Sequence, residues 1–355
     1  MSKFYPFKNL AFQGGGVKTL AYQGALYVLE AEGILDQIEH VVGTSAGAVV
    51  AMLVSFRLSM DETFTVFNTL DFARVPRLRS VKDLQWQPPK LVEPQLDRLV
   101  ANFDGVKRLL YEYGWYAHDH GYTWLHEVIA ERCGGNGRAT FADFRNCGFR
   151  DLHVVVTNIS SRRMELFNAN NTPDVAVADA LLMSQSIPLF FEALQFDGQQ
   201  FGAGDYYGDG GVLNNFPLHV FDRPEMAGET EWFVNGVNWE TLGLRLYTPP
   251  DCPGSQRPVT SIISYMANLL EAMVDQQDAV YASNHSDHWR TINISNCCVS
   301  LTDFSIHPGA DDPKYQKLVA SGREAATAFL QNYEPPTPDQ LTKLKRILSH
   351  LWPLS

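Results

Sequence analysis

Two glycine-containing turns near the start of the chain constrain the fold more than any other feature. An apolar run at residues 9–13 ends in Gly14-Gly15-Gly16, and a second at residues 40–42 ends in Gly43-Thr44-Ser45-Ala46-Gly47. After each turn, apolar residues recur at the spacing of an α-helix. The chain therefore begins in the order β-α-β-α, which predicts an α/β domain whose parallel strands bring both turns to one edge of a sheet.

The second turn has the sequence of a nucleophile elbow. It matches the pattern G-x-S-x-G directly between a strand and a helix, the context in which a sharp turn displays a serine. Gly43 and Gly47 are small enough for that bend, and the N-terminus of the following helix favours developing negative charge. Ser45 is therefore the candidate nucleophile, and a tight turn without chemistry is the competing interpretation.

The first turn offers backbone amides to the same edge of the sheet. Without a Cβ, the amides of Gly14, Gly15 and Gly16 can approach an oxyanion closely. Lys18 either adds positive charge there or is a solvated lysine of the first helical turn. A nucleotide site is excluded, because Val17 stands where a P-loop requires glycine and Thr19 where a dinucleotide motif requires its third glycine.

A serine hydroxyl needs a neighbouring base, and the sequence leaves several candidates. Ser45 comes too early in the chain for the Ser-acid-His order of α/β-hydrolases. In Asp209-Gly210-Gly211 the aspartate can be presented at a strand end, and the apolar run at 212–216 indicates a further strand. Asp205 and Asp197 compete with Asp209. Several histidines lie in no recognisable catalytic or metal-binding motif: His118, His120, His126, His219, His285, His288 and His307.

Composition limits the remaining possibilities. The chain has 355 residues, 45% of them apolar and 19% charged, which is typical of a folded protein. Its net charge of −12 argues against nucleic acid as a partner. No signal peptide or membrane span is recognisable, so we expect a cytoplasmic or peripheral membrane protein, with signal-independent export left open. Five cysteines in no zinc or disulfide-scaffold pattern fit a reducing compartment.

Together these motifs resemble the patatin-like phospholipase family. The correspondence comprises Gly14-Gly15-Gly16-Val17-Lys18, Gly43-Thr44-Ser45-Ala46-Gly47 and Asp209-Gly210-Gly211, in the family's order and spacing. The segments 184–191 and 211–217 also look like family segments, so the likeness covers residues 8 to about 220. The sequence differs from the family pattern at two positions, neither of which is Ser45 or Asp209. Thr19 stands where the family usually has a glycine, and Gln13 precedes the glycines.

The resemblance implies a three-layer αβα sandwich with a mostly parallel central sheet. It also implies a serine lipid acyl hydrolase without metal or cofactor, acting on phospholipids or other lipid esters. Ser45 would be the nucleophile, Asp209 its general base, and Gly14 to Gly16 the oxyanion hole of a reaction through an acyl-enzyme. Lys18, Gly43, Gly47, Gly210 and Gly211 would support these motifs.

Two other functions remain open. A Ser-His-Asp carboxylesterase or lipase is one alternative, and a non-catalytic lipid-binding scaffold is the other.

The motifs also suggest how the chain is divided. We expect a catalytic core at 8–220, in which 71–124 is a candidate cap or membrane-facing excursion. That segment is rich in basic and aromatic residues, including Trp86 and Trp115. Residues 221–355 would complete the α/β domain and add C-terminal helices, with long ones predicted at 258–283 and 313–333.

Overall fold

The computed structural model describes residues 3–76, 108–228, 230–252, 258–260, 262–282, 284–309 and 311–335. Within them, a central sheet of eight strands has the order β12-β11-β1-β2-β4-β8-β7, and β5 pairs with β4. Five strands are mutually parallel: β1 (Asn9–Phe12), β2 (His40–Thr44), β4 (Asp151–Asn158), β11 (Thr241–Tyr247) and β12 (Thr291–Ser295). Antiparallel pairs add β5 (Arg163–Phe167), β8 (Asp205–Asp209) and β7 (Leu194–Phe196).

The central strands are apolar on both faces, as parallel strands covered on two sides must be. In β1, Leu10 and Phe12 enter the larger core cluster while Ala11 enters the smaller one on the opposite face. The same division separates Val154 from Val155 in β4. Because successive side chains of a strand alternate between faces, these short apolar runs place a core on each side of the sheet.

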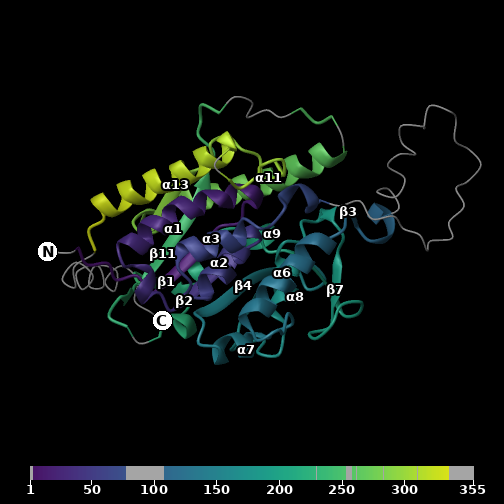
Figure 1. Ribbon diagram of the computed structural model, residues 1–355, viewed down its shortest axis with the longest axis horizontal. Helices are drawn as coiled ribbons and strands as arrows, with labels where there is room; N and C mark the ends of the chain where they lie inside the picture. Colours follow the sequence, from purple (N-terminus) through teal and green to yellow (C-terminus); the bar gives the residue numbers. More distant parts are fainter. Residues whose placement is uncertain are drawn as a thin grey trace, which may run out of the picture.

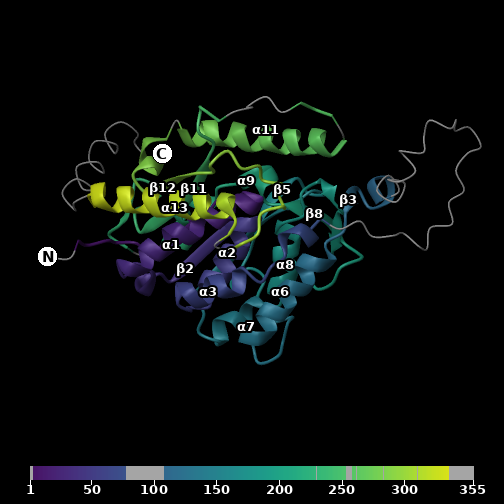
Figure 2. The same cartoon turned by 45° about the horizontal axis from the view of Figure 1, so that its top comes forward.

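Helices cover both faces of the sheet (Figures 1 and 2). The larger core contains side chains from α1 (Ala21–Ala31), α2 (Ala46–Ser55), α3 (Met60–Phe67), α6 (Asp119–Arg132), α7 (Phe141–Asn146), α8 (Val177–Ser184) and α13 (Pro313–Asn332). The smaller core lies under the 3₁₀ helix η5 (Pro217–Asp222) and α10 (Pro224–Ala227). This arrangement confirms the predicted mostly parallel sheet between helical layers.

The C-terminal half of the described chain contributes to the same sheet. Strands β11 and β12 extend it beyond β1, and α13 packs alongside α1 (Figure 1). The long helix α11 (Ile262–Ala282) contacts β6 (Leu189–Phe191) and α9 (Gly211–Asn214). Two small sheets are formed by β3 (Gly114–Tyr116) with β6, and by β9 (Phe233–Val234) with β10 (Val237–Asn238).

The strand predicted at 212–216 is wrong. The strand of this region is β8, which ends at Asp209, and the chain turns at Gly210 directly into the short helix α9. Gly210 already has helical dihedrals, φ −58° and ψ −26°. The apolar residues of this run therefore follow a helical turn, and their number alone did not distinguish that turn from a short strand.

Most of the predicted cap at 71–124 lies outside the described residues, which omit 77–107 and with them Trp86. The two tryptophans of this segment that are described are buried: Trp115 in β3 is 5% exposed and Trp124 in α6 is 6% exposed. The indole nitrogen of Trp124 also donates to the Thr69 hydroxyl at 2.9 Å. Trp115 and Trp124 therefore pack within the protein. None of the helices in the described part of the chain has the length and apolar character needed to cross a bilayer.

Candidate active site

Ser45 occupies a strained turn between β2 and α2. Its φ of 54° and ψ of −132° are rarely adopted by a residue with a side chain, and such strain typically costs about 1–3 kcal/mol. The turn is held by close packing, because a Cβ on Gly47 would lie 2.5 Å from the carbonyl oxygen of Gln13. Gly47 therefore lets the first turn of α2 rest directly on the end of β1.

The register of the sheet brings Asp209 to the level of Ser45. Thr44 pairs with Val155 across β2 and β4, and Val156, the next residue of β4, pairs with Asp209 across β4 and β8. Ser45 and Asp209 thus flank β4 at the same height although they are 164 positions apart. The Ser45 hydroxyl donates to Asp209 Oδ2 at 2.6 Å, and both residues are buried.

The surroundings of Asp209 make its carboxyl group a stronger base than an ordinary aspartate. Burial raises the pKa of Asp209 from 3.8 to about 7, because the charged form loses its hydration. Hydrogen bonds from the Ser45 hydroxyl and from the Gly211 amide, at 2.7 Å, oppose this shift only in part. Near neutral pH, Asp209 is therefore poised between its protonated and its proton-accepting form.

A second serine, which the motifs did not single out, orients the elbow. The backbone amide of Ser45 donates to the Ser184 hydroxyl at 2.9 Å, and that hydroxyl donates to the Val155 carbonyl at 2.7 Å. Ser184 is fully buried at the end of α8. Ser184 is the first residue of the segment 184–191, which resembles the patatin-like family. That resemblance is the one sequence signal that could have identified Ser184 as a site residue.

The glycine turn is fastened to the loop that follows Asp209. The Gly14 amide donates to the Asn215 carbonyl at 2.9 Å, and the Asn215 side-chain amide donates to the Gly14 carbonyl at 3.2 Å. The Gly14 amide is thus already bound to Asn215, which leaves Gly15 and Gly16 as the oxyanion donors to be tested. Gly16 has φ of +53°, and a Cβ there would lie 2.1 Å from the Leu301 carbonyl oxygen.

Gln277 of α11 holds the same loop from the other side. Its side-chain nitrogen donates to the Gly211 carbonyl at 2.8 Å, and its side-chain oxygen accepts from the Asn215 amide at 2.7 Å. No motif marks Gln277, because its role depends on the contact between α11 and α9, which are remote in sequence. The dyad, the glycine turn and α11 are therefore joined by one hydrogen-bond network.

The other predicted site residues occupy distinct places. Lys18 lies in η1 (Gly16–Leu20) and lines the pocket over Ser45, while Gly43 and Gly210 pack closely against neighbouring backbone. Asp205 accepts from Asn158 at 2.9 Å, and Asp197 accepts from the Gln199 and Gln200 amides of its own turn. Both competing aspartates therefore have structural hydrogen bonds.

The histidines whose contacts the structure gives interact with residues other than Ser45. The ring of His219 pairs with Asp287 at 2.7 Å, and the ring of His288 lies tilted against that of Tyr281, with the centroids 4.7 Å apart. His118 shares a cavity with Ser45, but its Nε2 lies 3.1 Å from the Glu192 carbonyl oxygen and 3.2 Å from the Ser186 hydroxyl. Burial lowers the pKa of His118 to about 4, so this ring is neutral at physiological pH.

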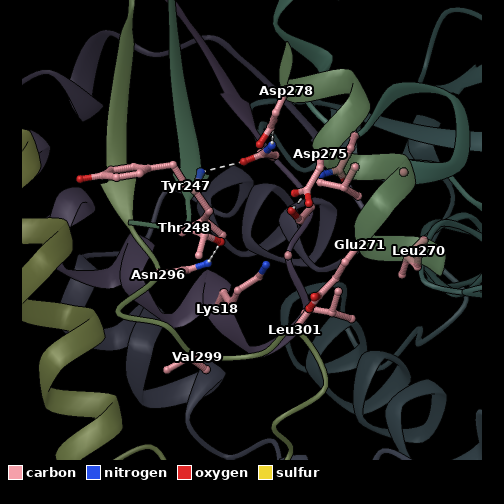
Figure 3. Close-up of a pocket in the computed structure, with 18 of the residues that line it drawn as sticks. Lys18, Tyr247, Thr248, Leu270, Glu271, Asp275, Asp278, Asn296, Val299 and Leu301 are labelled. Atoms are coloured by element: carbon pink, nitrogen blue, oxygen red, sulfur yellow. Dashed lines mark hydrogen bonds between the residues drawn. The ribbon is translucent and has the colours of Figure 1, made fainter. Parts of the chain in front are cut away.

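Two cavities meet at Ser45. The larger one, the polar pocket, has a volume of about 410 Å³ and is lined, with Ser45 and Asp209, by Lys18, Arg245, Glu271, Asp275, Asp278 and Asn296 among others (Figure 3). The smaller one, the apolar crevice, measures about 80 Å³ and is lined, with Ser45 and His118, mainly by apolar side chains such as Val49, Phe67, Leu182, Phe191 and Phe304. Ser45 therefore stands between a polar and an apolar environment.

A disulfide lies in the wall of the polar pocket, which the cysteine pattern had not indicated. Cys252 follows β11 and Cys298 follows β12, and the two are bonded across 46 positions. Next to Cys298 in the same wall, the Asn296 side chain donates to Thr248 at 2.7 Å (Figure 3). The sequence analysis expected reduced cysteines, so this disulfide differs from that expectation. It forms because the parallel strands β11 and β12 are neighbours and bring together two cysteines that are remote in sequence.

Within the described residues, no group of three or more His, Cys, Asp and Glu side chains is arranged to hold a metal ion. His126 of the noted histidine group lies against Tyr122 with ring centroids 4.4 Å apart. The sequence-level prediction of a metal-free reaction stays a prediction.

Comparison with known proteins connects this geometry to a family. The sequence model of the patatin-like phospholipase family matches residues 10–222. YqhO of Bacillus subtilis (strain 168), which is uncharacterized, is 26% identical over 91% of this chain and 97% of its own length. Protein 463L of Invertebrate iridescent virus 6, named a probable lipid hydrolase, is 22% identical over 64% of this chain and 69% of its own.

A solved structure shares the fold. The crystal structure of VipD from Legionella pneumophila aligns with a TM-score of 0.55 at 18% identity, covering 92% of this chain and 67% of VipD. At this level of identity the likeness concerns the arrangement of strands and helices alone.

Proposed function

Because the chain belongs to the patatin-like phospholipase family, a family of lipid hydrolases, we propose that it cleaves carboxylic esters of phospholipids or related lipids through a Ser45–Asp209 dyad. The observation that carries this proposal is the 2.6 Å hydrogen bond from the Ser45 hydroxyl to the buried Asp209 carboxylate. The strained turn at Ser45 supports it, since such strain is common at sites of catalysis.

The proposed reaction proceeds through an acyl-enzyme. Asp209 accepts the proton of the Ser45 hydroxyl while the serine oxygen attacks the ester carbonyl. The amides of Gly15 and Gly16 and the N-terminus of α2 would stabilise the negative charge on the carbonyl oxygen. The alcohol part of the lipid then leaves with the proton from Asp209. A water molecule, deprotonated in turn by Asp209, then attacks the acyl–Ser45 ester. The bond to the Ser45 oxygen breaks, that oxygen takes the proton back from Asp209, and the fatty acid is released.

The two cavities suggest how an ester would lie over Ser45. The apolar crevice is lined by hydrocarbon side chains and suits the acyl chain, because burying each methylene there contributes about 0.8 kcal/mol. The polar pocket then receives the alcohol portion of the lipid. The ester carbonyl would sit at the junction, beside the serine hydroxyl and the glycine turn.

The test is hydrolysis of p-nitrophenyl octanoate and of phosphatidylcholine vesicles by wild type, Ser45→Ala, Asp209→Asn and His118→Ala. We expect Ser45→Ala and Asp209→Asn to lose turnover at least about 10³-fold while remaining folded, as judged by circular dichroism. His118→Ala should lose much less turnover than these two variants, because His118 lines the apolar crevice but its ring nitrogen is bound to Glu192 and Ser186.

Three results would each contradict a different part of the proposal. Full activity of folded Asp209→Asn would assign the base to another residue. Loss of turnover in His118→Ala, with retained activity in Asp209→Asn, would favour the histidine-dependent esterase. Failure of wild-type Ser45 to react with a fluorophosphonate probe, together with no release of product, would favour a non-catalytic lipid-binding scaffold.

A further inference from the structure

The side-chain amide of Asn215 lies beside the dyad, directly after α9. Asn215 is 4% exposed and lines the polar pocket together with Ser45 and Asp209. A Cβ on Gly211 would lie 2.8 Å from Asn215 Oδ1 and 2.9 Å from Asp209 Oδ1. A Cβ on Gly14 would contact the same Asn215 oxygen and, at 3.1 Å, the Cβ of Ser45. The amide oxygen of Asn215 is therefore a close neighbour of both dyad residues.

This oxygen is the one hydrogen-bonding group of Asn215 without a partner among the described residues. The backbone amide of Asn215 donates to Gln277 at 2.7 Å. Its backbone carbonyl accepts from the Gly14 amide at 2.9 Å, and its side-chain nitrogen donates to the Gly14 carbonyl at 3.2 Å. Because a buried acceptor without a hydrogen bond is costly, we expect a group that enters the pocket to donate to the side-chain oxygen.

The second half of the proposed reaction brings a suitable donor to this place. After acylation the Ser45 oxygen carries no proton, so its 2.6 Å hydrogen bond to Asp209 Oδ2 is lost and the carboxylate is open to water. The distances at Gly211 put Asn215 Oδ1 at most about 6 Å from Asp209 Oδ1, which one water molecule spans with two hydrogen bonds of about 2.8 Å each. A polar pocket with two acceptors therefore meets the requirements for an ordered water molecule.

We propose that Asn215 holds the water molecule that hydrolyses the acyl-enzyme, an inference that rests on the proposed ester hydrolysis at Ser45. The water donates one proton to Asn215 Oδ1 and keeps it there, and it gives the other proton to Asp209. Its oxygen forms a bond to the acyl carbon, and the bond from that carbon to the Ser45 oxygen breaks. The proton on Asp209 passes to the Ser45 oxygen, and the fatty acid leaves. With both hydrogens directed to acceptors, a lone pair of the water faces the acyl carbon.

A purely structural role of Asn215 would have different consequences. Its bonds to Gly14 fasten the glycine turn, so their loss would weaken the stabilisation of the oxyanion whichever nucleophile attacks. Holding the water affects attack by water alone. Methanol separates the two roles, because it has a single hydroxyl proton. Once methanol gives that proton to Asp209, it has none for Asn215.

The experiment measures how the acyl-enzyme divides between water and methanol. p-Nitrophenyl octanoate is turned over in a fixed concentration of methanol, and the ratio of methyl octanoate to octanoic acid is determined after subtraction of the products formed with Ser45→Ala. This ratio depends on the competition of the two nucleophiles for one intermediate. It is therefore independent of the fraction of a variant that is folded and of the rate of acylation.

Four variants are compared with wild type. Asn215→Leu and Asn215→Ala both remove the acceptor oxygen, the first while filling the space of the amide and the second while opening it. Asn215→Asp keeps an acceptor oxygen but has no hydrogen for the Gly14 carbonyl. Gln277→Met is the matched control, because it removes the bonds of Gln277 to the same loop and leaves Asn215 Oδ1 in place.

Loss of the acceptor oxygen should raise the ratio of methyl ester to acid about threefold to tenfold in Asn215→Leu and Asn215→Ala, the effect of one lost hydrogen bond. Asn215→Asp and Gln277→Met should keep the wild-type ratio even where they slow turnover.

The inference and the proposed function fail in different ways. If neither Asn215→Leu nor Asn215→Ala raises the ratio above that of Asn215→Asp, including the case in which no form makes methyl ester, the inference is overturned and Asn215 only anchors the glycine turn. An equal rise in Gln277→Met would overturn it as well. If wild type releases no p-nitrophenol in a Ser45-dependent way, the proposed function fails and this inference fails with it.

Discussion

The backbone amide of Ser45 is bound by the hydroxyl of Ser184, the last residue of α8, at a distance of 2.9 Å. The same hydroxyl donates to the Val155 carbonyl of β4, so one buried side chain connects the elbow, the sheet and a second helix. Because Ser45 has an unfavourable backbone conformation, this bond helps to hold the turn in the orientation that points the serine hydroxyl at Asp209.

Replacing Ser184 by alanine should therefore affect both stability and turnover. The change leaves the Ser45 amide and the Val155 carbonyl buried without this partner, and each such group typically costs about 1–3 kcal/mol. We expect a loss of stability in that range together with a lower kcat. Urea unfolding and p-nitrophenyl ester kinetics provide the two measurements.

Ser55→Ala is the matched control for Ser184→Ala. Ser55 is also fully buried, but its hydroxyl donates only within α2, to the Met52 carbonyl at 2.6 Å. It should lose stability without a comparable loss of kcat. Equal effects of the two substitutions on kcat would show that the Ser184 bond does not orient the nucleophile.

Activity should rise with pH around neutrality. Asp209 must be deprotonated to accept the Ser45 proton, and burial raises its pKa to about 7. The kcat/KM of a soluble ester should therefore increase about tenfold per pH unit below 7 and level off above it. The measurement is a pH profile from about 5 to 9 with p-nitrophenyl octanoate, corrected for the pH dependence of product absorbance. A flat profile across this range would argue against Asp209 as the essential base.

The same shift should make Asp209 destabilising at high pH. A carboxyl group whose pKa is raised in the folded state stabilises that state fully below the unfolded value near 3.9, and loses this contribution as pH rises through about 7. The loss amounts to about 4 kcal/mol in total. Asp209→Asn removes it, so the variant should gain stability relative to wild type between pH 5 and pH 8, measured by urea unfolding. An equal difference at both pH values would contradict the raised pKa.

The sequence located the parts of the candidate site that depend on local pattern. The turn at Ser45 was predictable because glycines, strand and helix are adjacent in the chain. Asp209 was the better partner for Ser45 on its local sequence, but that evidence was weak alone, since an aspartate before two glycines is also an ordinary turn, and the family resemblance supplied the rest. The mostly parallel sheet followed from the initial β-α-β-α order.

Parts that depend on distant contacts were not predictable. The pairing of Cys252 with Cys298 required knowing that β11 and β12 are neighbours, because five cysteines allow many pairings. Gln277 reaches the loop after Asp209 because α11 contacts α9, and no motif encodes that contact. The prediction that included Gly14 among the oxyanion donors missed the bond of its amide to Asn215, which is remote in sequence.

The apolar crevice predicts a chain-length effect. Val49 lies on α2 one turn beyond Ser45 and lines the crevice. A phenylalanine there should exclude about two methylenes of the acyl chain, at a cost of about 1.6 kcal/mol, or more than tenfold in relative rate. Val49→Phe should therefore shift the preferred p-nitrophenyl ester to a shorter chain, while Val49→Ala should shift it to a longer one. An unchanged chain-length profile in both folded variants would place the acyl chain elsewhere.

The disulfide predicts that reduction destabilises the wall of the polar pocket. In the chain-entropy description, closing 46 positions contributes up to about 4 kcal/mol, and measured values usually fall at 2–4 kcal/mol. Thermal unfolding of wild type should shift to lower temperature on addition of dithiothreitol, whereas Cys252→Ser should start lower and not respond. Cys147→Ser, which removes an exposed free thiol, should behave like wild type.

Reduction should also lower ester turnover. Leu301 follows the disulfide cysteine Cys298 by three residues, and its carbonyl accepts from the Val17 amide beside the glycine turn. A wild-type protein with the same unfolding temperature and turnover with and without dithiothreitol would show that this bond does not support the site.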